Sequence, residues 1–383
     1  MNKLKAYHFH NGGGGGVLSV IKNLITFSQN LAIENHVIYT INKEQTPVFI
    51  IEHIKGSVTE QTFYYSPKWN FYYTCQQLAK LLPGNEVLVI AHDWLELGMM
   101  SNLGLQNPLV FFVHGDYEYY YQLAQKHESV IDQFICVAKS IEPKLVTLLP
   151  HRKDNMAYLR FPVPCIINNR VLKQYFNIIF IGRLTADKGY PLLPLIAKIL
   201  CRQNIDVVWH IAGAAPNGMD NVVWDKKINV HFYGNVSNDR ILALLKDMQI
   251  LILPSIAEGM PVTIIEAMKA GVIPVVNNID GGIQELVINK ETGYKIDGND
   301  LEAYTEKIIE LFNNRSLAET IKRNCIEKAN NLFDPVDNTR MIEQKFQQVS
   351  ASLRMKKNAK RVYGSRLDQA WIPNIITKSV RSI

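Results

Sequence analysis

Apolar residues along the chain follow two alternating patterns. Short runs rich in β-branched and aromatic residues predict strands, which in the first half occur at 5–10, 36–41, 87–91, 109–114 and 134–137. Amphipathic stretches between several of these runs predict helices at 17–30, 71–82 and 140–149. This alternation predicts an α/β fold with a parallel sheet covered on both faces.

A second series of the same kind follows a break in the pattern. Prolines and polar residues gather at 163–174, and further strands are predicted at 178–181, 207–212, 230–233, 250–253 and 272–276. From about residue 335 a long helical stretch leads into a basic tail. At 383 residues the chain is too long for one compact core, so we expect two domains that divide at 164/165.

The most informative segment is 254–276, PSIAEGMPVTIIEAMKAGVIPVV. Glu258 lies in a short loop, and Glu266 follows among apolar residues, where a carboxylate needs hydrogen-bond donors. Pro261 opens a helix that Gly271 ends, and the free N–H groups of 259–262 suit an anion or sugar hydroxyls. The segment is otherwise an ordinary loop–helix–strand unit.

Residues 181–189, IGRLTADKG, follow a predicted buried strand and carry Arg183 and Lys188 on a turn. Two cations at this position are able to neutralise a diphosphate without a metal ion. The alternative is that both are solvated charges on a loop. No Asp-x-Asp occurs in the chain, so we expect no metal and no cofactor.

The glycine run 12–16 follows the first strand and opens a helix, which allows close approach to phosphate or sugar. A dinucleotide cofactor would need an acid at the end of the second strand, and none stands at 39–42. Further polar residues follow predicted strands: His92, Asp93, His114, Asp116, Gly234 and Asn235. Tyr117 begins a tyrosine cluster that either stacks on sugar rings or packs on the domain.

The motifs at 181–189 and 254–276 resemble the signature of family 4 retaining glycosyltransferases, and the resemblance covers roughly residues 4–350. It implies two Rossmann-like domains facing each other across a cleft (the GT-B fold). The first would span 1–164, the donor domain 165–349, and a C-terminal segment at about 350–383 would pack back on the first. Two departures are the placing of Asp116 one residue late and a linker, LRFPVPC at 159–165, without the family's Pro-Asn-Gly turn.

The same resemblance implies roles for individual residues. The catalytic group would comprise His114, Glu258, Arg183 and Lys188. The donor would be held by Gly13, Gly14, Arg183, Lys188, Gly234, Asn235, Glu258, Gly259, Met260, Pro261 and Glu266, with Glu266 on the ribose. The acceptor side would comprise His92, Asp93, Asp116 and Tyr117.

The expected reaction moves a sugar from a UDP- or GDP-linked donor to the hydroxyl of a glycan or lipid-linked glycan, in bacterial surface polysaccharide, lipopolysaccharide or glycolipid assembly. One alternative is a catalytically inactive nucleotide-sugar-binding or scaffold protein on the same fold. A second is a nicotinamide-dependent oxidoreductase.

The composition, 47% hydrophobic and 20% charged, is that of a globular protein. Five scattered cysteines without a C-x-x-C pair predict neither a disulfide framework nor a zinc site, and a cytoplasmic location is expected. Residues 352–383 hold eight Lys/Arg and one acid, so the formal charge of +6 resides in the tail and indicates no nucleic-acid binding by the body. The hypothesis is that bases at 354–366 hold the protein on an anionic membrane face, and the alternative is a solvated helix face.

Overall fold

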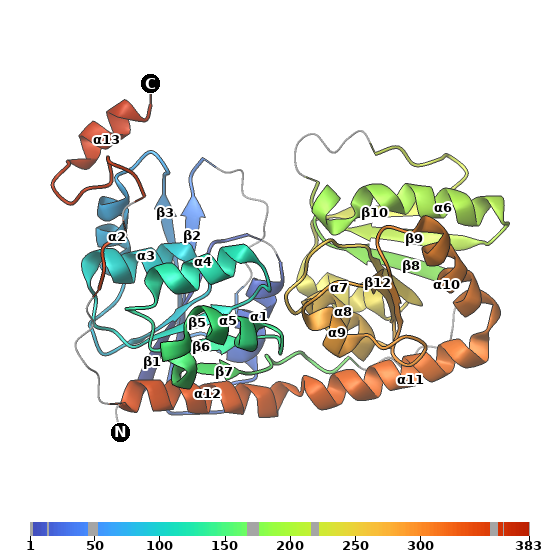
Figure 1. Cartoon of the computed structure of the whole chain (residues 1–383), viewed down its shortest axis with the longest axis horizontal. Coiled ribbons are helices and arrows are strands. Elements are labelled where there is room, and N and C mark those ends of the chain that lie inside the picture. Colours follow the sequence, from blue (N-terminus) through green and yellow to red (C-terminus); the bar gives the residue numbers. More distant parts are fainter. Residues whose placement is uncertain are drawn as a thin grey trace. The chain divides into compact units, whose positions relative to one another are not determined.

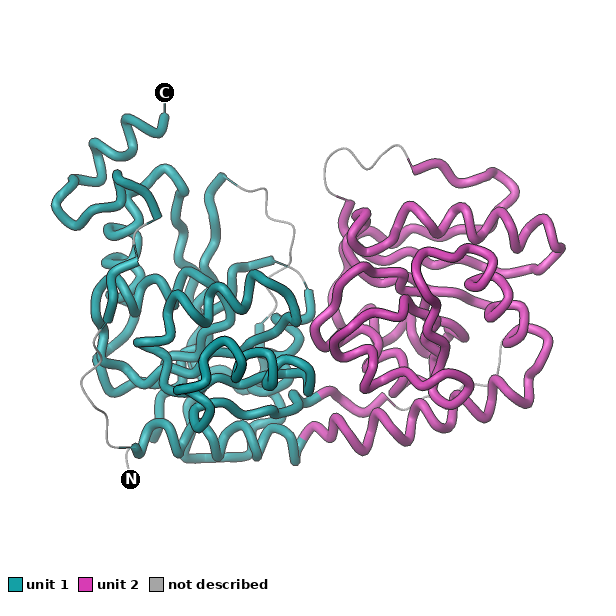
Figure 2. The backbone as a smooth tube through the Cα atoms, in the orientation of Figure 1, with its two compact units in different colours: residues 1–162, 336–383 teal, residues 163–335 magenta. Residues whose placement is uncertain are grey.

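The computed structural model describes residues 3–13, 15–44, 53–166, 176–215, 222–352, 359–362 and 364–382. They form two compact units (Figure 2). Unit 1 comprises Met1–Pro162 and Val336–Ile383, and unit 2 comprises Val163–Pro335. The predicted pair of parallel α/β domains is confirmed.

Unit 1 is built on a sheet of order β3-β2-β1-β4-β5-β6-β7 in which every pair is parallel. Its strands are β1 (Leu4–His10), β2 (Ile33–Asn42), β3 (Thr59–Tyr65), β4 (Leu88–Ala91), β5 (Leu109–Val113), β6 (Gln133–Cys136) and β7 (Met156–Tyr158). The helices of unit 1 are α1 (Gly16–Thr26), α2 (Phe71–Ala79), α3 (Trp94–Leu103), α4 (Glu118–His127), α5 (Ile141–Leu148), α12 (Pro335–Ala351) and α13 (Asn374–Val380).

Unit 2 repeats the architecture with the order β10-β9-β8-β11-β12-β13, again parallel throughout. Its strands are β8 (Phe176–Ile181), β9 (Val207–Ala212), β10 (Val230–Gly234), β11 (Ile250–Leu253), β12 (Ile273–Asn277) and β13 (Tyr294–Ile296). Its helices are α6 (Leu193–Arg202), α7 (Asn238–Leu245), α8 (Val262–Lys269), α9 (Gly282–Leu286), α10 (Leu301–Asn313) and α11 (Arg315–Leu332). Helices lie on both faces of each sheet (Figure 1).

The strand order reverses direction once in each sheet. In unit 1 β1 lies between β2 and β4, and in unit 2 β8 lies between β9 and β11. The helices that follow neighbouring strands therefore go to opposite faces at this point, and in open α/β sheets ligands bind outside the carboxyl ends of such strands. The central strands β4, β5 and β11 are wholly buried, so polar groups gather at their ends.

The bounds of the two units differ from the bounds predicted from the sequence at two places. Unit 1 ends at Pro162 rather than at residue 164, and the chain returns to it at Val336 rather than near residue 350. Helix α12 belongs to unit 1 because the Phe346 ring lies against His8 and Phe112, with ring centroids 6.2 and 6.3 Å away. The returning segment thus includes this helix as well as the tail.

A buried lysine joins the beginning of unit 2 to its end. The Lys269 ammonium, at the end of α8, donates to the carbonyl oxygens of Val163 and Phe333 at 2.7 and 2.8 Å. Burial lowers the pKa of Lys269 to about 8. The two backbone carbonyls satisfy the buried cation, and the contact ties the beginning of the unit to its end.

Gly213→Ala should destabilise unit 2 by about 2–4 kcal/mol. Gly213 has φ +152°, and a Cβ there would overlap the Gly182 carbonyl oxygen. Gly298→Ala is the matched control: its φ is +61° but no atom lies within 4 Å, so only the backbone cost of about 1 kcal/mol applies. Urea unfolding of both variants measures the difference, and equal losses would contradict the steric argument.

Candidate active site at the carboxyl ends of the strands

Two loops of unit 2 lie against each other at the reversal point of its sheet. The loop after β8 carries Arg183 and Lys188, and the loop after β11 carries Glu258. The Ile256 amide donates to the Asp187 carbonyl oxygen at 3.0 Å. Gly189, at φ +72°, lies so close to the Pro254 carbonyl that no larger residue fits. This backbone contact brings together two motifs that are 70 residues apart in the sequence.

An ion pair joins the motifs at this contact. The Lys188 ammonium lies 2.7 Å from Glu258 Oε1, and the two side chains are only 20% and 12% exposed. Arg183, which is 66% exposed, pairs with Asp187 at 3.1 Å. Both cations predicted for a diphosphate therefore lie at the carboxyl end of the sheet, and each is neutralised by a carboxylate of the same region.

Glu266 lies on α8, about one helix turn after the start of the helix, and its side chain is buried, with 1% exposed. Its Oε1 accepts a hydrogen bond of 2.8 Å from the side-chain amide of Asn238, which begins α7. The turn with Gly234, at φ +64°, comes shortly before α7. The carboxylate and the turn predicted to contact the nucleotide are thus linked through Asn238, which the sequence analysis missed because no motif marks it.

A third loop of unit 2 joins the site, and the sequence analysis did not name it. After β12 the Gly282 amide donates to the Gly259 carbonyl oxygen at 2.6 Å. Gly281 adopts φ +99°, which favours glycine. Two glycines directly after a buried strand, at 281–282, are the sequence signal that marks this loop. Pro261 precedes α8 as its N-cap rather than lying in its first turn.

In unit 1 the loops after β1, β4 and β5 are tied together by Asp93. Its carboxylate accepts from the Asn11 side-chain amide at 2.8 Å and from the Tyr119 hydroxyl. It also caps α3, and Glu96 completes the capping box by accepting from the His92 and Asp93 amides at 2.7 Å. Asp93 therefore organises the strand ends. Gly13 lies in the first of these loops, while Gly14 lies outside the described residues.

Histidines form a stack at the same strand ends. His92 Nδ1 lies 2.8 Å from His114 Nε2, and the ring centroids are 5.1 Å apart. His8 stacks on the other side of His92 at 5.9 Å. Burial lowers the pKa of His8 to about 4 and that of His114 to about 3, and it lowers the pKa of His92 well below its usual value. These rings are neutral at pH 7, so they act as hydrogen-bonding groups rather than as cations.

Asp116 and Tyr117, predicted for the acceptor side, lie just after His114. Asp116 accepts from the Lys144 ammonium at 3.0 Å and from the Tyr121 hydroxyl at 2.6 Å, so its carboxylate joins α4 to α5. Tyr117 is 44% exposed at the start of α4. The tyrosines of the cluster differ in their surroundings. Tyr120 packs on the domain, because it is buried against the His114 ring, whereas the exposed Tyr117 remains a candidate for stacking on a sugar ring.

Three further findings concern the described residues. No group of three His, Cys, Asp or Glu side chains among them is placed to hold a metal ion. All five cysteines are free thiols. None of the described helices has the length and apolar character needed to cross a membrane.

Comparisons with known proteins extend these observations. Residues 167–328 match the family model of Glycosyl transferases group 1. The capsular polysaccharide biosynthesis glycosyltransferase CapM of Staphylococcus aureus is 26% identical over 219 residues, covering 52% of this chain and 57% of CapM. A UDP-Gal:alpha-D-GlcNAc-diphosphoundecaprenol alpha-1,3-galactosyltransferase of Escherichia coli is 25% identical over 219 residues, covering 54% and 55%. The matches thus span little more than half the length of these curated relatives.

The fold is similar to that of a solved structure over most of the chain. Alr3699/HepE from Anabaena, crystallised with UDP and glucose, superposes with a TM-score of 0.73 at 16% identity, covering 90% of this chain and 100% of that one. Two parallel α/β units with polar groups at their strand ends define the GT-B architecture of glycosyltransferases. The similarity to the Glycosyl transferases group 1 model is confined to residues 167–328, which lie in unit 2.

The free energy of unfolding should fall as the pH drops from about 6.5 to 4, because the unfolded histidines titrate near 6.5 and the buried ones do not. Glu96 acts in the opposite sense: its pKa is raised by burial to about 8, so its contribution is lost as the pH rises through that value. His92→Phe should reduce the acid slope by up to about 1.4 kcal/mol per pH unit. Urea titrations at several pH values measure this slope, and parallel curves for both proteins would refute it.

Proposed function

We propose that the chain is a retaining glycosyltransferase that moves a sugar from a nucleotide diphosphate sugar to an acceptor hydroxyl without a metal ion. The observation that carries the proposal is the Lys188–Glu258 ion pair at the carboxyl ends of β8 and β11. A half-buried cation beside a carboxylate suits a ligand that has an anionic diphosphate next to sugar hydroxyls. The Glycosyl transferases group 1 match over the same unit supports this assignment.

Each group in unit 2 has a role in the proposal. Lys188 and Arg183 neutralise the diphosphate, with Lys188 shared between the donor and Glu258. Glu258 and the backbone at 259–261 hold the sugar hydroxyls. Glu266 binds the ribose, held in place by Asn238. The turn at Gly234 and Asn235 contacts the base.

The proposed reaction is a same-face substitution. The bond from the acceptor oxygen to the anomeric carbon forms on the face from which the phosphate leaves, and the acceptor proton passes to that phosphate. The protein contributes positioning and charge stabilisation, so the two cations matter most as negative charge grows on the leaving diphosphate.

In unit 1 we assign to His114 a hydrogen bond with the donor sugar, and to His92 the role of holding the His114 ring in position. His92 Nδ1 is hydrogen-bonded to His114 Nε2, so a sugar hydroxyl at the strand end meets His114 Nδ1. The low pKa of His114, caused by burial, keeps the ring neutral and suited to hydrogen bonds with hydroxyls. We assign the acceptor to the surface that carries Asp93 and Tyr117.

We propose a uridine or guanosine diphosphate sugar as donor, with uridine to be tested first. The support is that HepE was crystallised with UDP and glucose and the pneumococcal O-GlcNAc transferase GtfA with UDP and GlcNAc. The proposed acceptor is a glycan or lipid-linked glycan, because relatives include CapM and an undecaprenol-linked galactosyltransferase. The proposed location is the cytoplasm, with attachment to the inner membrane face through bases at 354–366, of which Arg354, Lys356 and Lys357 lie outside the described residues.

Arg183→Ala and Lys188→Ala should each lower kcat/KM by about 30- to 1,000-fold, equivalent to 2–4 kcal/mol of lost transition-state stabilisation. The fold should survive, because both residues lie in loops at the edge of the sheet. The measurement is release of UDP from UDP-sugars in EDTA, with Lys198→Ala on α6 as the control. Turnover near the wild-type value in either variant would remove the diphosphate assignment, and donor binding without turnover in the wild type would favour the inactive scaffold.

Glu266→Gln should mainly raise the donor KM, since it changes a hydrogen bond present before and during the reaction. Glu258→Gln should mainly lower kcat, because it touches the sugar that reacts. Initial rates over a range of donor concentrations separate the two parameters. Identical effects of the two substitutions on kcat and KM would show that this division of roles is wrong.

A further inference from the structure

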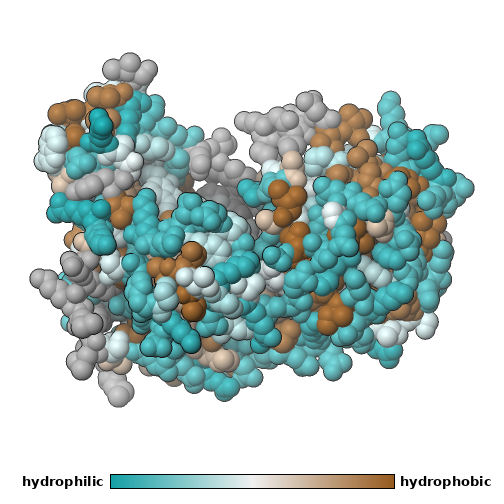
Figure 3. Space-filling view, in the orientation of Figure 1, coloured by the Kyte–Doolittle hydropathy of each residue, from teal (hydrophilic) through white to brown (hydrophobic). Residues whose placement is uncertain are grey.

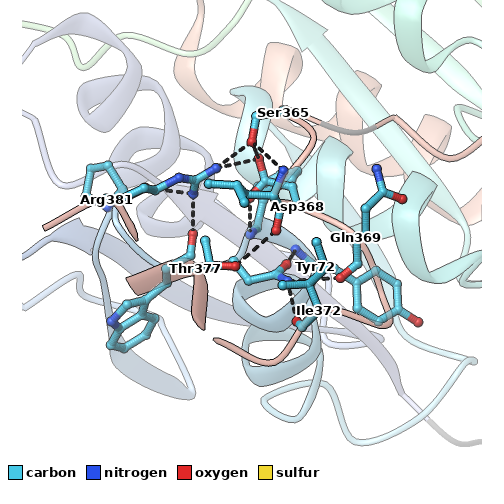
Figure 4. Close-up of polar contacts among 12 residues, drawn as sticks. Tyr72, Ser365, Asp368, Gln369, Ile372, Thr377 and Arg381 are labelled. Carbon is cyan, nitrogen blue, oxygen red and sulfur yellow. Dashed lines mark hydrogen bonds and ion pairs between the residues drawn. The ribbon is translucent and has the colours of Figure 1, made fainter. Parts of the chain in front are cut away.

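The C-terminal segment at 364–382 is fixed to the body of unit 1 by polar contacts around the start of α2 (Figure 4). The Asn70 side-chain amide donates to the carbonyl oxygens of Gln369 and Ile372 at 2.9 and 2.8 Å. The Asn70 backbone amide donates to the Asn374 side chain at 2.8 Å. The Phe71 amide donates to Asp368 at 2.7 Å. The N-terminus of α2 thus anchors the loop that leads into α13.

Arg381 completes this attachment from the far end of α13 (Figure 4). Its guanidinium lies 2.9 Å from the buried Asp368 carboxylate and donates to the Trp69 carbonyl oxygen at 2.7 Å. Thr377, which is fully buried, donates to the Leu367 carbonyl oxygen at 3.1 Å. The two polar side chains that α13 turns toward the protein, Thr377 and Arg381, are therefore both hydrogen-bonded.

The opposite face of α13 is exposed and carries apolar side chains, with Ser379 among them. Ile375 and Ile376 are 74% and 51% exposed, and Val380 flanks them at 50%. Trp371, just before the helix, is 79% exposed. At 100° per residue, Ile375 lies on the far side of the helix from Thr377. Figure 3 shows hydrophobic surface among hydrophilic surface at the end of the molecule that carries α13. The usual order of a surface helix, apolar inward and polar outward, is inverted here.

The exposed charged residues that the structure describes on α13 and in the loop before it are basic. Residues 352–383 contain eight bases, and their only acid, Asp368, is buried and paired with Arg381. Lys378 on α13 and Arg366 in the preceding loop are exposed. An apolar face with an exposed tryptophan and a rim of cations matches the interface of an anionic bilayer.

We propose that Trp371, Ile375, Ile376 and Val380 form a docking surface, the α13 face, that inserts into the interface of an anionic lipid membrane. The network of Asn70, Asp368 and Arg381 holds the α13 face in a fixed orientation, so binding orders little additional chain. A second copy of the chain is disfavoured as the occupant, because both surfaces would bring the same positive charge. Membrane binding would bring the protein close to the lipid-linked acceptor of the proposed function. Only this role of the α13 face rests on the proposed function; the binding itself does not.

The test is co-sedimentation of the full chain with vesicles of phosphatidylglycerol and phosphatidylcholine. Wild type should bind these vesicles at low salt and bind pure phosphatidylcholine vesicles at least tenfold less. Ile375→Ser combined with Ile376→Ser should reduce binding to anionic vesicles about tenfold or more, because two exposed branched side chains no longer enter the apolar layer. Leu31→Ser is the matched control: Leu31 is 87% exposed in the same unit and should not affect binding.

Three outcomes would overturn the proposal. Wild type that stays in the supernatant at low salt would exclude a lipid partner. A double variant that binds as wild type does would assign binding to the bases at 354–366 alone. A wild-type dimer that the double variant converts to monomer in sedimentation analysis would make the α13 face an interface between copies. An unchanged melting temperature shows that the double variant is folded, since both side chains point away from the protein.

This experiment separates the α13 face from the proposed reaction. UDP release from a UDP-sugar, measured without vesicles, should be the same in wild type and in the double variant. Loss of vesicle binding with full UDP release would support both proposals. Vesicle binding by a chain that releases no UDP would leave the α13 face standing and remove the glycosyltransferase reaction.

Discussion

In a parallel sheet that is covered on both faces, charged and polar side chains gather at the ends of the strands, and both units of this chain follow that constraint. Strands such as β5 and β11 are wholly buried, so charges within them would lack solvation. Lys188, Glu258, His92 and Asp93 all follow a strand at the point where strand order reverses. The loops there are held by backbone contacts that only glycine allows, as at Gly189. The order of the strands therefore determines where polar side chains gather, whatever those side chains are.

The charges at these ends are neutralised within the protein, which sets how they meet a ligand. Lys188 is paired with Glu258, so it is held in one position without an isolated charge in a half-buried loop. Under the proposed function, a diphosphate would add negative charge beside the lysine, which would then be shared between the ligand and Glu258. The histidine stack in unit 1 avoids charge in a different way, because burial keeps its rings neutral at physiological pH. Both arrangements hold polar groups in fixed positions at the strand ends without an unpaired buried charge.

Much of the fold follows from the sequence, and the reasons for the remainder are physical. The strands at 207–212 and 250–253 have the predicted bounds because they are apolar runs, interrupted in the first only by His210. Strand β3 was not predicted: it is an edge strand whose Thr59, Gln61 and Thr62 are exposed, and β7 and β13 are only three residues long. The motifs singled out Lys188, Glu258 and Glu266 as candidate site residues. They did not predict that Lys188 pairs with Glu258 or that Glu266 bonds to Asn238. The first contact depends on how two loops 70 residues apart meet, and the second on how α7 and α8 pack, with partners 28 residues apart.

Helix α13 follows the opposite rule to the strand ends. At the strand ends, polar groups face outward from a buried apolar framework. In α13, Thr377 and Arg381 face inward and Ile375 faces solvent. A helix of seven residues has little stability of its own, so this orientation is held by the contacts of Asp368 and Arg381. If hydrophobic burial alone placed the helix, it would turn its isoleucines toward unit 1. The polar attachment is therefore what keeps the apolar face exposed, and it makes that face a fixed feature of the fold.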